Sequence, residues 1–230
     1  MKKLLHVKFV IFDIDDTLFP STEFASLARK NAINAMISMG LEEDSDSLYQ
    51  MLMQIIEQKG SNYQNHFDEL CKRLKVKDRS RFVAAAVAAY HDTKTSIAPY
   101  PKVPLTLMRL RQMGFKLAVA TSGSSLKQWD KLIRLKLALY FDHVFISEDL
   151  GVEKGTSFYK KVIQSIDAIP EECLMVGDRV EKDILPAKSA GMHTAYVVSG
   201  GKYSKSSSNS KCDFTINDIS ELLVLLKSKS

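Results

Sequence analysis

The pattern of apolar and polar positions divides the chain into an alternating part and a purely helical part. A continuous apolar run at residues 9–12 stops abruptly at Asp13. Such a run, closed by a polar cluster, predicts a buried strand at the centre of a parallel sheet. Between residues 21 and 95, apolar positions instead recur at helical spacing, which predicts four helices and no strand. They are expected at residues 21–40, 46–59, 66–75 and 80–91.

Strand and helix patterns alternate after residue 98. Strands are predicted at 116–120, 143–146, 173–176 and 194–198, with a short edge strand at 214–216. Helices are predicted at 103–113, 126–137, 157–166 and 219–226. A further helix is predicted to follow Asp178 and to end at Ala190. This alternation is typical of an α/β fold with a doubly wound, Rossmann-like parallel sheet. Residues 1–17 and 98–230 are therefore expected to form the core, with an all-helical cap subdomain inserted at 18–97.

One segment and one single residue of the predicted core stand out by composition. Residues 200–211 are rich in Ser and Lys and are predicted to form a flexible loop. The single tryptophan, Trp129, falls in a predicted helix and is expected to pack that helix on the sheet.

Composition narrows the classes of protein that remain. Apolar residues make up 45% of the chain and charged residues 26%, which is ordinary for a globular protein. There is no apolar stretch of membrane-spanning length or of signal-peptide form, so a cytoplasmic location is expected. A net charge of +5 without a dense basic face argues against a nucleic-acid partner. The three cysteines are scattered and lack metal-site spacing.

The strongest chemical signal is the pair of acids after the first predicted strand. Asp13 and Asp15 are two residues apart, so in an extended chain both side chains point to the same side. Ligands of open parallel sheets bind at the carboxyl ends of the strands, which is where these acids lie. Two neighbouring carboxylates repel each other, and a divalent cation with oxygen ligands would relieve the repulsion. Taken alone, the pair would also fit an acidic turn or a helix cap.

Further polar clusters follow the later strands, and the whole set resembles a known family. The segment Asp13-x-Asp15-x-Thr17 matches the first motif of the haloacid dehalogenase-like superfamily of phosphohydrolases, and Gly177-Asp178-x-x-x-x-Asp183 matches the fourth. The helical insertion matches that superfamily's cap. More narrowly, four short segments resemble archaeal members that act as glyceraldehyde 3-phosphate phosphatases. These segments are Gly60-Ser-Asn-Tyr, His66-Phe-Asp, Lys127-Gln-Trp and Val176-Gly-Asp-Arg.

The resemblance implies a role for each matching residue. Asp13 would be the nucleophile that forms an aspartyl-phosphate, and Asp15 would protonate the leaving group and then activate water. Mg²⁺ would be held by Asp13, the backbone carbonyl of Asp15, and Asp178. The substrate phosphate would be bound by Thr121, Ser122, Gly123 and Lys154. Asp183 would orient Lys154 or a metal-bound water.

Two positions depart from the family's usual pattern. Ser122 stands where Asn or Asp is common, but hydroxyl and backbone donors remain. Gly155 stands where Pro is common after the lysine, which is expected to loosen the loop that holds Lys154.

Several functions remain open at this point. The expected partner is a small phosphorylated metabolite, such as glyceraldehyde 3-phosphate, a nucleotide or phosphoglycolate. A sugar-phosphate mutase would share every motif. A dehalogenase would need neither Mg²⁺ nor Asp15. A phospho-receiver signalling domain would lack the helical insertion. Either a monomer or a homodimer fits the sequence.

Overall fold

The computed structural model describes residues 6–61, 63–198 and 211–226. The chain forms two compact units. Residues 1–22 and 98–230 make up one, called here the core unit, and residues 23–97 make up the other, the helical unit. Apart from residue 211, the predicted loop at 200–211 lies outside the described residues.

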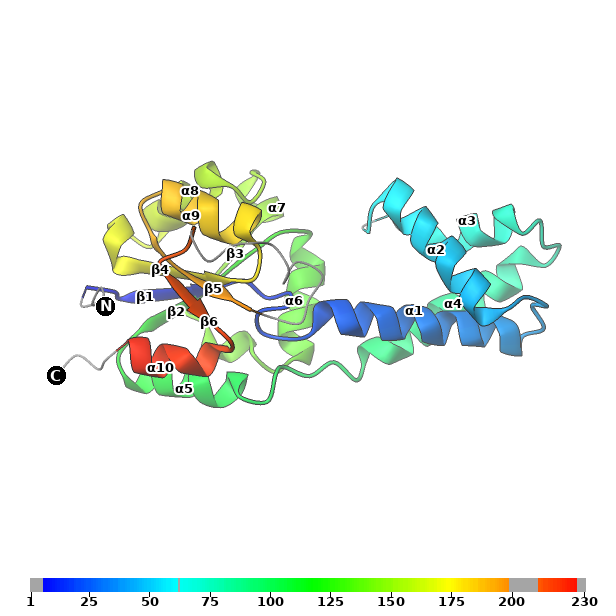
Figure 1. The fold of residues 1–230 in the computed structure, drawn as a ribbon, viewed down its shortest axis with the longest axis horizontal. Coiled ribbons are helices and arrows are strands. Elements are labelled where there is room, and N and C mark those ends of the chain that lie inside the picture. The colour runs from blue at the N-terminus through cyan, green and yellow to red at the C-terminus, as the bar shows by residue number, and fades with distance from the viewer. Residues whose placement is uncertain (1–5, 62, 199–210, 227–230) are drawn as a thin grey trace. The chain divides into compact units, whose positions relative to one another are not determined.

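The core unit is built on a six-stranded sheet (Figure 1). Its strands are β1 (Phe9–Phe12), β2 (Lys116–Thr121), β3 (His143–Ile146), β4 (Cys173–Gly177), β5 (His193–Val197) and β6 (Phe214–Ile216). They follow the order β3-β2-β1-β4-β5-β6, and every pairing is parallel. The predicted doubly wound sheet is therefore confirmed, with β1 between two neighbours and β6 at an edge.

The register of the sheet brings the ends of three strands level with one another. Phe12, the last residue of β1, pairs with Val119 of β2 and with Val176 of β4. The next residue, Asp13, extends this ladder by donating its N–H to the carbonyl of Val176 at 2.9 Å. The strand order reverses at β1, and this is where open α/β sheets bind their ligands.

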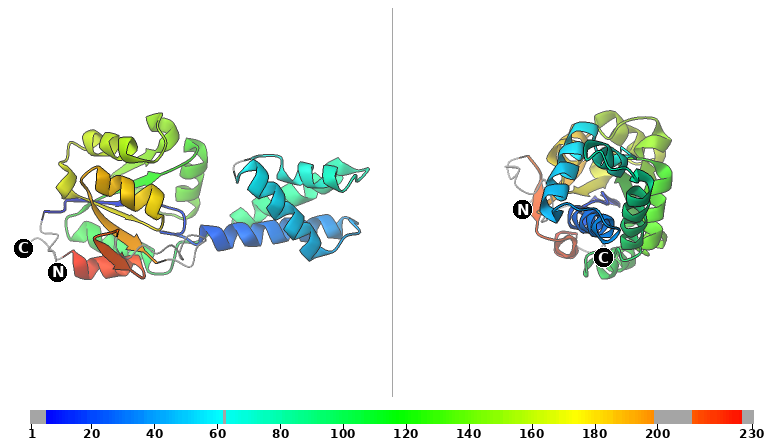
Figure 2. Two further views of the ribbon diagram at one scale, coloured as in Figure 1. Left: turned by 45° about the horizontal axis from the view of Figure 1, so that its top comes forward. Right: turned by 90° about the vertical axis from the view of Figure 1, so that its right-hand side faces the viewer.

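Helices cover both faces of the sheet (Figure 2). The longer core helices are α5 (Val103–Gln112), α6 (Ser125–Arg134) and α8 (Thr156–Ser165), and the shorter ones are α7 (Ser147–Leu150), α9 (Leu185–Ser189) and α10 (Leu222–Leu225). On one face, Phe158 of α8 and Ala187 of α9 pack with Ile11 of β1. On the other face, α5 and α10 lie side by side (Figures 1 and 2). Burial on both faces explains why the central strands are continuously apolar.

Two parts of the core differ from the sequence prediction. The four-residue helix α7 was not predicted, because it is too short to show a helical period. The helix expected up to Ala190 is instead a π-helical turn, Val180–Ile184, that runs into α9. Pro186 has no N–H and cannot bond to the carbonyl of Lys182 four residues earlier. That carbonyl accepts the hydroxyl of Tyr159 instead, at 3.1 Å.

The helical unit has an apolar core of its own. Its helices are α1 (Ser21–Ser38), which begins within the core unit, α2 (Ser45–Lys59), α3 (His66–Arg73) and α4 (Arg79–Lys94). Ile33, Leu52 and Phe82, from three of these helices, are buried in one cluster. The structure therefore has the four predicted helices between residues 21 and 95.

Residues 18–22 belong to the core unit, although the insertion was expected to begin at 18. Two contacts explain this placement. The N–H of Tyr100 donates to the carbonyl of Leu18 at 2.9 Å, and the N–H of Thr22 donates to Oδ1 of Asp16 at 2.9 Å. Both chain segments that lead to the helical unit are thus bonded within the core unit.

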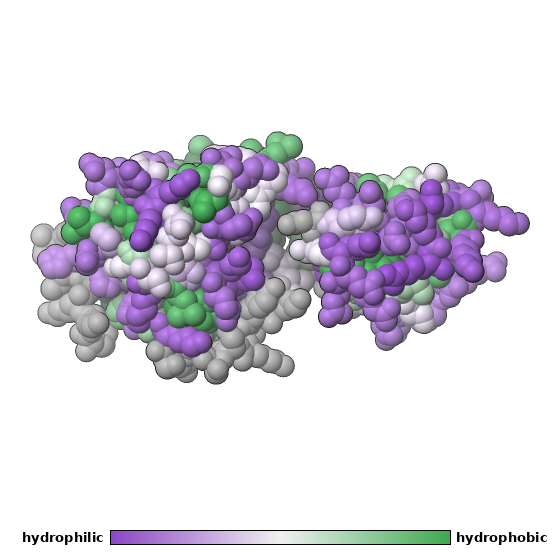
Figure 3. Space-filling model, turned by 90° about the horizontal axis from the view of Figure 1, so that it is seen from above, coloured by the Kyte–Doolittle hydropathy of each residue, from purple (hydrophilic) through white to green (hydrophobic). Residues whose placement is uncertain are grey.

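The face of the molecule seen in Figure 3 is mainly hydrophilic. In Figure 3, hydrophobic side chains form small separate groups among hydrophilic ones on each unit. None of the described helices combines the length and the apolar character that crossing a membrane requires.

Candidate active site

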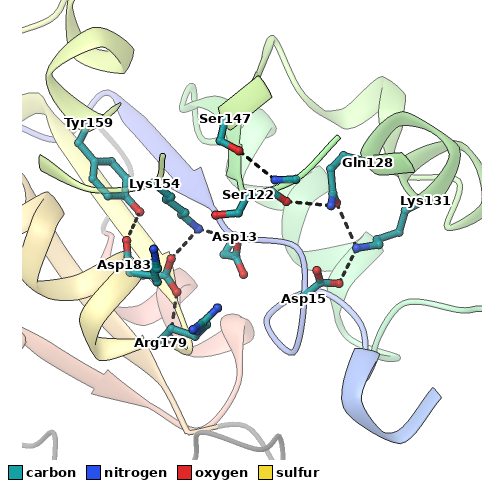
Figure 4. A network of polar contacts seen from close by, with 12 residues as sticks. Asp13, Asp15, Ser122, Gln128, Lys131, Ser147, Lys154, Tyr159, Arg179 and Asp183 are labelled. Atoms are coloured by element: carbon teal, nitrogen blue, oxygen red, sulfur yellow. Dashed lines mark hydrogen bonds and ion pairs between the residues drawn. The ribbon is translucent and has the colours of Figure 1, made fainter. Parts of the chain in front are cut away.

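Asp13 lies in a buried cluster of charged side chains at the end of β1 (Figure 4). Its Oδ1 accepts a hydrogen bond from Nζ of Lys154 at 2.6 Å. The same ammonium lies 2.5 Å from Oδ1 of Asp183. All three side chains are at most 8% exposed. Lys154 therefore places a buried positive charge between two carboxylates from different parts of the chain.

A third carboxylate, Asp178, follows β4 directly and completes the cluster. Carboxylate oxygens of Asp13, Asp178 and Asp183 all lie within 4.8 Å of one another. Asp183 is fixed by the N–H of Arg179, which donates to its Oδ2 at 2.9 Å. A Cβ at Gly177 would overlap the side chain of Asp183. The glycine of the fourth motif is therefore a steric requirement of this close approach.

The surroundings of the cluster shift the ionisation of its members. Burial raises the pKa of Asp13 to about 7, with Lys154 opposing the shift and Asp183 adding to it. Burial and the charges of Asp13 and Asp183 raise the pKa of Asp178 to about 8. For Lys154, burial alone would lower the pKa, but the two carboxylates outweigh it and hold the pKa well above its ordinary value. The site thus contains more buried negative charge than one lysine can balance.

The cluster fits a divalent cation. Oδ1 of Asp178 is buried and has no hydrogen-bond partner among the described residues. An unpartnered carboxylate oxygen beside two others is the donor set that hard cations such as Mg²⁺ prefer. A cation bound there would also balance the excess negative charge.

Asp15 lies apart from this cluster. Its Oδ1 accepts a hydrogen bond from Nζ of Lys131, on α6, at 2.6 Å (Figure 4). β1 ends at Phe12, so sheet pairing does not impose the strand period of two on the residues beyond Asp13. Asp13 and Asp15 were expected to point to the same side, and in the structure the two carboxylates face different lysines, Lys154 and Lys131.

The predicted phosphate-binding residues form a turn after β2. Thr121 ends that strand and is buried. Gly123 has a φ of 119°, and a Cβ there would lie 2.9 Å from Nε2 of Gln128. That Nε2 donates to the carbonyl of Ser122 at 2.9 Å. The N–H of Gly123 donates to Oγ of Ser147 at 2.9 Å, so in this structure it serves to shape the turn.

The short helix α7 supports this turn, which the sequence did not reveal. Besides the contact of Ser147 with Gly123, Glu148 accepts the N–H of Ser125 at 2.7 Å. A carboxylate at that position satisfies a free N–H at the start of α6. α7 therefore fixes both the turn and the beginning of the helix that follows it.

Sequence analysis gave no role to Gln128, although it lies in the segment Lys127-Gln-Trp, and missed Lys131. They are three residues apart on α6 and so share a face of the helix. Nζ of Lys131 donates to Oε1 of Gln128 at 3.1 Å. Trp129, expected to pack on the sheet, is 39% exposed, so that prediction was wrong. The spacing of two polar residues just after a site motif was the signal that could have revealed them.

Comparison with known proteins agrees with this site. Residues 10–197 match the model of the haloacid dehalogenase-like hydrolase family. A glyceraldehyde 3-phosphate phosphatase of Methanopyrus kandleri is 48% identical over 201 residues, which cover 86% of each chain. One of Methanocaldococcus jannaschii is 41% identical over 223 residues, covering 96% of this chain and 97% of that protein.

A solved structure has the same fold. The HAD phosphatase from Thermococcus onnurineus aligns with a TM-score of 0.70 at 23% sequence identity, and the alignment covers 97% of this chain and 99% of that one. The resemblance first inferred from the motifs is confirmed by these matches. This chain belongs to the haloacid dehalogenase-like hydrolase family.

Proposed function

We propose that this chain is a Mg²⁺-dependent phosphatase that hydrolyses a small phosphomonoester through an aspartyl-phosphate on Asp13. The observation that carries the proposal is the buried ammonium of Lys154, held between Asp13 and Asp183. Beside it lies an oxygen of Asp178 that no described residue hydrogen-bonds. Phosphoryl transfer depends mainly on positioning and charge stabilisation, which this arrangement supplies.

In the first half-reaction, a carboxylate oxygen of Asp13 attacks phosphorus and the ester P–O bond breaks. Asp15 gives its proton to the departing alkoxide. In the second half-reaction, Asp15 takes a proton from water, whose oxygen attacks the phosphorus of the aspartyl-phosphate. The bond to Asp13 breaks, inorganic phosphate leaves, and both carboxyl groups return to their starting states.

Lys154 has two tasks in this scheme. Its charge favours the ionised form of Asp13 that attacks phosphorus, and later offsets the charge of the phosphoryl group. Asp183 holds the ammonium in place, at 2.5 Å. Thr121 and Ser122 bind phosphate oxygens at the turn before α6. Mg²⁺, held by Asp13, Asp178 and the backbone carbonyl of Asp15, would supply further stabilisation of negative charge on the phosphoryl oxygens.

We propose glyceraldehyde 3-phosphate as the substrate and the helical unit as the cap that selects it. The two relatives described above bear the name of that activity, at 48% and 41% identity over most of the chain. Phosphoglycolate and nucleotides are the competing esters. We also propose a cytoplasmic location, where small phosphorylated metabolites of this kind are found.

Phosphate release from a panel of esters tests the proposal. The panel contains p-nitrophenyl phosphate, glyceraldehyde 3-phosphate, phosphoglycolate and nucleoside monophosphates, each assayed with Mg²⁺ and with EDTA. Release with Mg²⁺, abolished by EDTA and by Asp13→Asn, is the expected result. A folded Asp13→Asn variant that turns over at the wild-type rate would refute the assigned nucleophile. Isomerised sugar phosphate without release would indicate a mutase.

A further inference from the structure

Lys131 is a second lysine at this edge of the sheet, and the scheme above gives it no task. Its Nζ lies 2.6 Å from Oδ1 of Asp15, and its side chain is only 20% exposed. In Figure 4, the carboxylate of Asp15 faces Lys131 on one side of the site, and that of Asp13 faces Lys154 on the other. Each carboxylate of the first motif therefore has a lysine of its own.

Two contacts hold Lys131 in place besides the carboxylate, and one of them is continued by a further hydrogen bond. Its Nζ donates to Oε1 of Gln128 at 3.1 Å, and Gln128 in turn donates to the carbonyl of Ser122 at 2.9 Å. The ammonium also lies 5.5 Å from the centre of the Phe19 ring, within the range of a cation–π contact. Gln128 is buried and bonds both to Lys131 and to Ser122. It therefore links the position of Lys131 to the turn that carries the predicted phosphate-binding residues.

An ion pair as exposed as Lys131–Asp15 adds little to the stability of a fold, so stability does not explain this arrangement. Reaction geometry does. In phosphoryl transfer the attacking and leaving oxygens lie on opposite sides of phosphorus. The group that protonates the leaving oxygen must therefore stand away from the nucleophile. We infer that Lys131 is the positioning residue that holds the Asp15 carboxylate apart from Asp13, on the leaving-group side.

This inference rests on the proposed acid role of Asp15, and the choice of leaving group tests both. A p-nitrophenolate leaves without a proton, whereas the alkoxide of glyceraldehyde 3-phosphate needs one. kcat/KM reports the steps up to phosphorylation of Asp13. For Lys131→Met, kcat/KM should fall about 10–100-fold with glyceraldehyde 3-phosphate and less than about threefold with p-nitrophenyl phosphate. Lys131→Arg, which keeps the charge, should recover most of the loss.

Two further variants complete the test. Lys127→Met removes the same charge from an exposed position of α6 and should behave as wild type. The double variant Asp15→Asn/Lys131→Met should be no slower than Asp15→Asn alone, because both changes disable one group.

Equal losses on the two esters, or a Lys131→Met enzyme identical to wild type, would overturn the inference. Equal losses through a raised KM would assign Lys131 to phosphate binding instead. If Asp15→Asn itself left the rate with glyceraldehyde 3-phosphate unchanged, the proposed function of Asp15 would fail. That outcome is separate from any result on Lys131.

Discussion

Asp13 and Asp15 are two residues apart, and each contacts a lysine at 2.6 Å, but their surroundings differ sharply. The side chains of Asp13 and Lys154 are 8% and 3% exposed, whereas those of Asp15 and Lys131 are 42% and 20% exposed. Charges attract more strongly where water is excluded, and separating them there is costly. Although the two contact distances are equal, the buried Asp13–Lys154 pair is firmly held, whereas the more exposed Asp15–Lys131 pair is held only weakly.

This difference matches the two proposed tasks. A nucleophile must stay ionised and aimed at one point, and breaking a buried pair costs about 3–5 kcal/mol. An acid that gives and takes a proton needs a partner that positions it without binding it tightly, and an exposed pair is worth only about 0–1 kcal/mol. The two pairs show how burial, with the same residue types, separates a fixed role from an exchanging one.

The largest expected effect comes from removing the buried lysine. Lys154→Met leaves three buried carboxylates without their cation and should lower kcat about 10³-fold or more, with either ester. Lys131→Met should spare p-nitrophenyl phosphate, so that ester separates the two lysines. Steady-state rates with a circular-dichroism check of the fold provide the measurement. Similar losses for both lysines with p-nitrophenyl phosphate would contradict the comparison.

Mg²⁺ should stabilise the fold by balancing the excess negative charge of the buried carboxylates, and the effect should depend on pH. A carboxyl whose folded pKa is raised contributes stability below its unfolded pKa and loses it as pH rises through the folded value. With folded values of about 7 and 8 for Asp13 and Asp178, the metal-free protein should lose stability from about pH 4 to 8. Mg²⁺ binds the ionised carboxylates and should raise the melting temperature more at pH 8 than at pH 6.

Asp178→Asn tests the origin of that effect. This variant should melt above wild type at pH 8 in EDTA, because it lacks one buried charge. It should also lose most of the gain with Mg²⁺, which for a chain of this size is about 2–4 °C for each kcal/mol of binding. Asp218→Asn, a matched change at the exposed ion pair with Lys102, should keep the gain. Full retention of the gain in Asp178→Asn would exclude Asp178 as a ligand.

The buried side of the site was largely predictable from sequence. Parallel strands buried on both faces are continuous apolar runs, so residues 9–12 and 143–146 were predicted with the bounds that they have in the structure. The carboxyl ends of such strands share one edge, which brings Asp13 and Asp178 together. Asp183 was expected to orient Lys154 or a metal-bound water, and it contacts the ammonium of Lys154.

The exposed side was not predictable in the same way. Lys131 reaches Asp15 because of the face that α6 presents, and Trp129 suggested a different face. The side to which Asp15 turns depends on where β1 ends and on the contact with Lys131, 116 residues away along the chain. Neither choice leaves a periodic pattern, because each is settled by packing between distant segments.

The smallest effect is expected from Tyr159→Phe, which tests how firmly the buried pair is held. The Tyr159 ring is fully buried, and its hydroxyl donates to the carbonyl of Lys182 at 3.1 Å and contacts Lys154. Losing the hydroxyl should destabilise the fold by about 0.5–1.5 kcal/mol, measured by urea unfolding. kcat should fall only about threefold, since two carboxylates still hold Lys154. If kcat of Tyr159→Phe fell nearly as far as that of Lys154→Met, with KM unchanged, the Tyr159 hydroxyl would be needed to hold the ammonium of Lys154 in place. The contrast between the two pairs would then rest on Tyr159 as well as on burial.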